Sequence, residues 1–124
     1  MKTISTNNAA LPLGHYAQAI VSNGFVFVSG QLPIDPNNID APIGDIKDQT
    51  RKTLKNLEET LKAAGSELNK VVKTTIFISD ISLWAAANEV YAEVFGEHRP
   101  ARSAVPVKDL PRGFHIEIEA VATV

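Results

Sequence analysis

Apolar, β-branched and aromatic residues gather in short runs along the 124-residue chain, a pattern typical of strands. The run Phe25–Val28 is apolar at every position, so a strand there presents apolar side chains on both faces. Asn23-Gly24 directly before it is a turn signal, which makes the run from Tyr16 to Val21 its expected hairpin partner. The first part of the chain is therefore predicted to form a β-hairpin.

Two more strands are predicted further along the chain. Residues Val71–Ser79 are rich in β-branched side chains, and the Ile-Phe-Ile at their centre again places apolar groups on both faces. Residues His115–Val124 alternate instead, with Ile116 and Ile118 on one side and Glu117 on the other. This last strand is predicted to turn an aliphatic face to the core and to place a carboxylate on the opposite face.

Two segments carry the three- and four-residue spacing of apolar positions that predicts a helix. The first runs from about Asp45 to Ala64 with Gly65 as its C-terminal cap, and the second runs from Ser82, its expected N-cap, to Phe95. Residues 31–44 hold three prolines and are predicted to be a loop. The two stripes are Ile46, Thr50, Leu54, Leu57, Leu61 and Ala64, and then Leu83, Ala87, Val90 or Tyr91, and Val94.

This order of elements predicts an α+β domain with two helices packed on one face of a single sheet. Two helices cover only one face, because each shields a strip roughly 10 Å wide. The strands at 25–28 and 71–78 are apolar on both sides, so a lone chain would leave an apolar sheet face in water. We therefore expect a homo-oligomer whose sheets meet through their helix-free faces, with ligand pockets in the clefts between subunits.

Length and composition agree with one globular domain over residues 1–124, with 44% hydrophobic and 21% charged residues. The formal net charge of -2 gives no general attraction to nucleic acid, and we expect no nucleic-acid partner. The absence of cysteine excludes thiolate nucleophiles and cysteine-ligated metals, and the three histidines lack metal-ligand spacing, so we expect no metal. No membrane-spanning run or signal peptide is visible, and the expected location is cytoplasmic.

Arg102 and Glu117 are the candidate chemical groups. Arg102 opens a short β-like run after Pro100, and its guanidinium offers a rigid fork of donors that matches a carboxylate. Glu117, on the helix-free face, has the chemistry to orient or deprotonate a water. Spacing alone leaves an alternative open, a structural ion pair of Arg102 with Glu117 or Glu119.

The stretch around these two residues reads Pro-Ala-Arg-Ser at 100–103, followed by Val105, Lys108, Leu110 and Ile-Glu-Ile at 116–118. This pattern resembles the signature of the YjgF/RidA family of reactive-intermediate deaminases. Further segments that fit the family are 14–19, 27–31, 50–65 and 72–78, so the resemblance covers nearly the whole chain. It implies a chorismate-mutase-like fold with a single mixed sheet, assembled as a homotrimer with inward-facing sheets and three pockets between subunits.

The activity that the resemblance implies is hydrolysis of 2-imino acids, such as 2-iminopropanoate and 2-iminobutanoate, to 2-oxo acids and ammonia, with no cofactor. Carried over by position, Arg102 would bind the substrate carboxylate and Glu117 would hold the attacking water. Tyr16, Ser29 and the backbone of Gly30 match substrate-binding positions of the family. An iminium carbon is already electrophilic, so positioning and proton transfer are sufficient chemistry.

Two residues depart from the family pattern. Ala104 stands where many bacterial members have cysteine, and His15 stands where proline commonly follows the glycine of the N-terminal motif. Neither departure touches Arg102 or Glu117. His15 is expected to be an exposed turn residue, and Trp84 and Tyr91 of the second helix are expected to pack rather than to form a stacking platform.

Two other functions stay open at this point. The same cleft, in a non-catalytic module, would capture a 2-oxo acid or another small carboxylate, and Arg102 serves that role equally well. Glu117 favours catalysis, because a carboxylate beside an anionic ligand is unfavourable unless water or a proton lies between them. An RNA-directed endoribonuclease or translation inhibitor is the other alternative, disfavoured by the acidic balance of the chain.

Overall fold

A computed structural model describes all 124 residues of the protein. Three short 3₁₀ turns, 68–70, 81–83 and 111–113, connect the main elements. No helix of the protein combines the length and the apolar character that crossing a membrane requires. The main elements are β1 (Lys2–Ile4), β2 (Ala19–Ser22), β3 (Phe25–Gln31), α1 (Ile46–Ala63), β4 (Val71–Ile78), α2 (Trp84–Phe95), β5 (Ala101–Pro106) and β6 (Ile116–Thr123).

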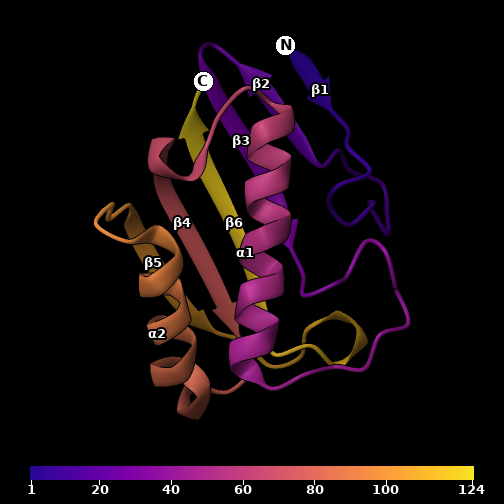
Figure 1. Cartoon of the computed structure of the whole chain (residues 1–124), viewed down its shortest axis with the longest axis vertical. Coiled ribbons are helices and arrows are strands. Elements are labelled where there is room, and N and C mark those ends of the chain that lie inside the picture. The colour runs from indigo at the N-terminus through magenta and orange to yellow at the C-terminus, as the bar shows by residue number, and fades with distance from the viewer.

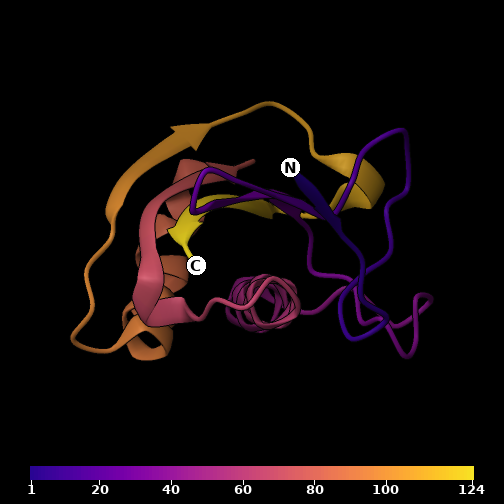
Figure 2. The ribbon, with the colours of Figure 1, turned by 90° about the horizontal axis from the view of Figure 1, so that it is seen from above.

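The strands form one six-stranded mixed sheet in the order β1-β2-β3-β6-β4-β5. Only β4 and β5 run parallel, and all other neighbours are antiparallel. Both helices lie on the same side of this sheet, with α1 crossing its centre and α2 beside β4 and β5 (Figures 1 and 2). The predicted class, an α+β domain with one mixed sheet and two helices on one face, is confirmed.

The core lies between this sheet and the two helices. In β6, Ile116, Ile118, Ala120 and Ala122 are buried in alternation with more exposed residues. They pack with Leu54, Leu57 and Leu61, which the three- and four-residue spacing placed on one helix face. Burial of each such large apolar side chain stabilises the fold by about 1.5–3 kcal/mol.

The face of the sheet away from the helices is apolar and uncovered. Phe25 and Phe27 of β3 are 41% and 48% exposed, whereas the alternating residues Val26 and Val28 are buried. Phe27 lies opposite Val121 of β6, so the apolar surface continues onto the next strand. The expected excess of apolar surface is therefore present on the helix-free face, as an associating sheet requires.

The helix ends correct one prediction. Asp45 caps α1 by accepting a hydrogen bond from the Asp48 amide at 2.8 Å, and Gly65 follows the helix with a φ of +80°. The second helix begins at Trp84, so Ser82 as its N-cap is wrong. Asp80 instead accepts from the Ser82 amide at 2.9 Å and starts a 3₁₀ turn that leads into the helix.

The N-terminal segment holds an edge strand that the hydrophobic pattern did not predict. β1 is only three residues long and pairs with β2, which is itself shorter than the expected run from Tyr16. Buried Gln18 holds the loop between β1 and β2 in place. Its side-chain amide accepts a hydrogen bond from the Thr6 backbone N–H and donates to the backbone carbonyls of Thr6 and Ala10. This attachment sets the course of residues 11–16, which lie at the cavity described next.

Candidate functional site

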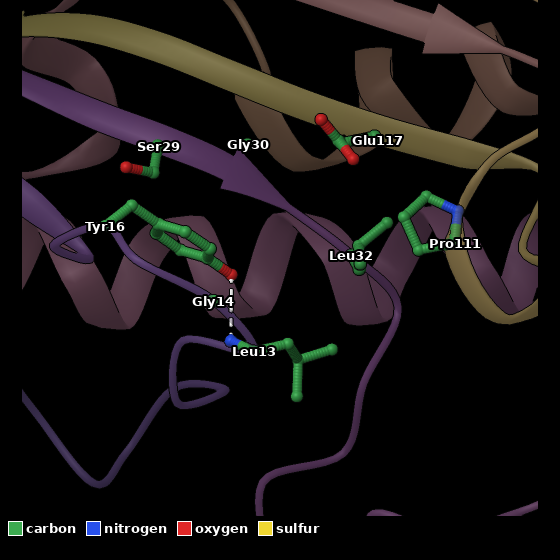
Figure 3. Close-up of a pocket in the computed structure, with 8 residues that line it drawn as sticks. All are labelled: Leu13, Gly14, Tyr16, Ser29, Gly30, Leu32, Pro111 and Glu117. Carbon is green, nitrogen blue, oxygen red and sulfur yellow. Dashed lines mark hydrogen bonds between the residues drawn. The ribbon is translucent and has the colours of Figure 1, made fainter.

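A cavity of about 460 Å³ opens where β3 and β6 meet the N-terminal loop (Figure 3). β3 contributes Ser29 and Gly30, and β6 contributes the carboxylate of Glu117. The remaining wall comes from three irregular segments and is mostly apolar. Its residues are Leu13, Gly14, Tyr16, Leu32 and Pro111.

Glu117 supplies the acid of this cavity. Its side chain lies on the helix-free face, because its neighbours Ile116 and Ile118 are buried against the helices. It forms no ion pair with any lysine, arginine or histidine of the chain. Partial burial raises the pKa of Glu117 above its ordinary value, and the negative charge of Glu119 raises it further. Such a carboxyl group is suited to accepting and returning a proton.

Gly30 lets the backbone of β3 approach this carboxylate. A Cβ placed on Gly30 would overlap the Glu117 carboxyl group, so every other residue type would displace it. The pairing of β3 with β6 is irregular between Val28 and Gln31, which is where Gly30 lies. Local irregularities of this kind often re-aim side chains beside functional sites. The glycine is therefore explained by the close approach and not by an unusual φ.

Tyr16 and Ser29 form the polar part of the wall. The hydroxyl of Tyr16 accepts a hydrogen bond from the Leu13 amide at 3.2 Å and closes the loop over the cavity (Figure 3). The hydroxyl of Ser29 donates to the Ala17 carbonyl at 2.6 Å, so its proton is committed and its oxygen remains an acceptor. Tyr16, Ser29, Gly30 and Glu117, four of the predicted site residues, thus line one cavity.

Arg102 lies in a different place. Its guanidinium donates to the Asn88 side chain at 2.8 Å, and its Cζ atom lies 4.8 Å from the ring centroids of Trp84 and Tyr91. It lines a separate cavity of about 550 Å³ beside α2. The guanidinium forms no ion pair within the chain, so its charge is free for an anion.

The sheet register shows why Arg102 and Glu117 do not meet within one chain. β4 separates their strands, with Thr74 opposite Arg102 and Phe77 opposite Glu117. Two strand spacings across and three residues along put their Cα atoms roughly 14 Å apart. Their side chains also lie on opposite faces of the sheet. The alternative of a structural ion pair from Arg102 to Glu117 or Glu119 is therefore wrong.

Sequence patterns missed part of both cavities. Leu13, Leu32 and Pro111 lie in irregular segments, where no periodicity indicates a shared location. Asn88 was detectable in principle, because Trp84, Asn88 and Tyr91 are spaced as one face of a helix. His15 is exposed and does not line the Glu117 cavity, which agrees with an exposed turn residue.

The histidines and acids do not form a metal centre. No three side chains of the histidine, aspartate and glutamate classes gather as a metal-binding group. His98 bonds the Val71 carbonyl at 2.7 Å, and His115 bonds the Ser79 hydroxyl at 2.7 Å. Both rings are therefore tied to separate parts of the fold.

Fold and cavity together define a small α+β domain with an uncovered apolar sheet face and a glutamate at the junction of two strands. The chain belongs to the Rid/YjgF family: the family model described as Endoribonuclease L-PSP matches residues 6–124, and the resemblance seen in the sequence is thereby confirmed.

Individual relatives match along almost their whole length. A RutC family protein of Pyrococcus horikoshii is 51% identical over 98% of this chain and 96% of its own. A rat protein named 2-iminobutanoate/2-iminopropanoate deaminase is 42% identical over 98% of this chain and 88% of its own. The crystal structure of Escherichia coli TdcF with bound serine superposes with a TM-score of 0.95 at 38% identity, covering 100% of this chain and 99% of that one.

Proposed function

We propose that the protein hydrolyses 2-imino acids to 2-oxo acids and ammonia. The observation that carries the proposal is the half-buried Glu117 carboxyl group, with its raised pKa, at the end of a mostly apolar cavity. A rat relative bears the name of this activity, and a relative of known structure has bound serine, an amino acid whose carboxylate and side chain resemble those of such substrates in size.

The reaction needs only water, a carboxylate and a fixed substrate. Glu117 accepts a proton as water attacks C2 of the imine, forming the C–O bond of a tetrahedral carbinolamine. Glu117 returns this proton to the nitrogen, then takes the proton of the new hydroxyl group and passes it to the same nitrogen. The C–N bond breaks as the C=O bond forms, and ammonia leaves. Atoms balance as one imino acid and one water giving one 2-oxo acid and one ammonia. A pKa above the ordinary glutamate value helps the second step, since the carboxylic acid must also donate.

A second copy of the chain completes the site in this proposal. Arg102 is the cation that would bind the substrate carboxylate, and a single chain holds it far from Glu117, on the other face of the sheet. The apolar helix-free face, with exposed Phe25 and Phe27, gives the copies a reason to associate. We propose a homotrimer, the assembly implied by the family, in which Arg102 of one copy faces the Glu117 cavity of the next.

The proposal is tested by ammonia release from 2-iminopropanoate and 2-iminobutanoate generated in the cuvette. The wild-type protein should accelerate release over buffer, and Arg102→Ala should lose about 10- to 100-fold in kcat/KM, the value of charge-assisted hydrogen bonds. Binding of 2-oxobutanoate without any acceleration would instead establish a carboxylate-binding module. RNA cleavage abolished by the same substitution, with no imine hydrolysis, would establish the nuclease alternative.

Gly30→Ala tests the close approach of β3 to Glu117. The added methyl group meets the flexible end of the Glu117 side chain, so the protein should fold with a loss of stability of about 1 kcal/mol or less. The displaced carboxylate should lower kcat about 10- to 100-fold, because small misplacements of reacting groups are costly. Thermal unfolding and the ammonia assay measure the two effects. A fully active Gly30→Ala protein would contradict this placement.

A further inference from the structure

Arg102 is supported by uncharged groups of α2 on one helix face. Its contacts are the Asn88 amide oxygen at 2.8 Å and the two rings of Trp84 and Tyr91, each with its centroid 4.8 Å from Cζ. An acid paired with an arginine orients its guanidinium and also offsets its charge. Here the orientation is supplied without an acid, so the guanidinium keeps its full charge.

One of the α2 residues that contact Arg102 is itself hydrogen-bonded to the sheet. The Tyr91 hydroxyl bonds the Thr74 hydroxyl at 2.7 Å, and both residues are buried. Thr74 lies directly opposite Arg102 in the parallel ladder of β4 and β5. The ring that contacts the guanidinium and the backbone that carries the arginine are therefore fixed to the same residue. Tyr91 also packs on Phe95, with ring centroids 4.6 Å apart.

An arginine side chain has several rotatable bonds, and a ligand that must order it loses affinity. Contacts that order the side chain before the ligand arrives remove this cost from binding. Two rings at the guanidinium and one amide oxygen at Nη1 also leave other N–H donors for an incoming carboxylate.

We propose that Trp84, Asn88 and Tyr91 are positioning residues that pre-orient Arg102 for the substrate carboxylate and leave its charge uncompensated. This inference rests on the proposed function, in which Arg102 binds that carboxylate. It assigns to α2 a role in substrate affinity, although α2 lies on the face of the sheet opposite Glu117.

The sharpest test compares Asn88→Ala with Asn88→Asp. Asn88→Ala removes one hydrogen bond and should weaken 2-oxobutanoate binding about 3- to 10-fold. Asn88→Asp keeps the shape and strengthens the contact with Arg102, but its carboxylate neutralises the guanidinium and should weaken binding about 30-fold or more. A purely structural role for Asn88 requires the opposite order, with Asp better than Ala.

The readouts are calorimetry with 2-oxobutanoate, thermal unfolding, and KM separately from kcat in the ammonia assay. Asn88→Asp should raise KM while kcat changes about twofold or less, because Asn88 acts through Arg102, which binds the carboxylate and takes no part in proton transfer. Asn69→Asp makes the same change at an exposed position outside α2 and should leave both constants unaltered. Trp84→Phe should keep most of the affinity, and Trp84→Leu should lose about fivefold.

Measurements on the wild-type protein distinguish a failure of the proposed function from a failure of the positioning role. If the wild-type protein neither binds 2-oxobutanoate nor accelerates imine hydrolysis, the proposed function fails. If the wild type is active and Asn88→Asp binds as well as Asn88→Ala or better, the positioning role is overturned while the proposed function stands. Tighter binding by Trp84→Leu than by Trp84→Phe would also overturn it.

Discussion

Glu117→Gln is expected to lower kcat for imine hydrolysis about 100- to 10,000-fold, the usual contribution of a general base. The amide keeps nearly the shape of the carboxyl group but has no site to accept the proton of the attacking water. It also introduces no buried charge, so the protein should fold and associate normally. Steady-state ammonia release and the melting temperature of the variant measure the two effects.

The pH dependence of kcat/KM provides an independent check on the role of Glu117. Glu117 acts as a base only when ionised, so kcat/KM should fall as the pH falls through its pKa, which lies above the ordinary glutamate value. Glu119→Gln removes a negative charge that raises this pKa, and should move the acid limb to lower pH without abolishing activity. An unchanged acid limb in Glu117→Gln would assign the proton transfer to another group.

Two impaired variants are expected to recover activity when they assemble together. If each site combines Glu117 of one chain with Arg102 of the next, a mixed trimer of Arg102→Ala and Glu117→Gln chains contains one site with both native residues. Random assembly at equal amounts gives native residues in about one quarter of all sites, and double purification, which keeps only mixed trimers, raises this fraction to about one third. Co-expression of the two variants with different affinity tags, followed by ammonia assays on doubly purified protein, measures the recovery.

The matched control is a double variant, Arg102→Ala with Glu117→Gln, co-assembled with Arg102→Ala. No site in that mixture has a native Arg102, so activity should stay at the level of the single variant. Light scattering reports the mass of each assembly. Assembled mixtures of the two single variants that recover nothing, from a wild type that is active, would show that the site does not combine these residues across chains.

The spacing of apolar residues predicted the helices and strands of the core, because each of them has at least one clearly apolar face. The β6 alternation fixed which residues meet α1, and the exposed Phe25 and Phe27 confirm that the opposite face is left apolar. The three-residue β1 escaped prediction because it is too short to show alternation. The start of α2 was misplaced because the Asp80 cap opens a 3₁₀ turn before the helix.

Motif resemblance located residues that line the Glu117 cavity but did not predict how they are arranged. Tyr16, Ser29, Gly30 and Glu117 do share one cavity, and Gly30 has a steric reason to be glycine there. Spacing suggested that Arg102 pairs with an acid fifteen or seventeen residues downstream, whereas it contacts Asn88 and two aromatic rings. Trp84 and Tyr91, expected only to pack, are part of that contact.

The sequence by itself determined the class of fold, the family and the apolar face that lacks a helix, because these follow from local periodicity and from residue identity at a motif. Only the tertiary structure decided that Arg102 and Glu117 lie on opposite sides of the sheet and two strands apart. That separation depends on the insertion of β4 between β5 and β6 and on its register, which are long-range pairings. Spacing along one strand carries no information about them, since pairing partners are chosen by the packing of the whole sheet.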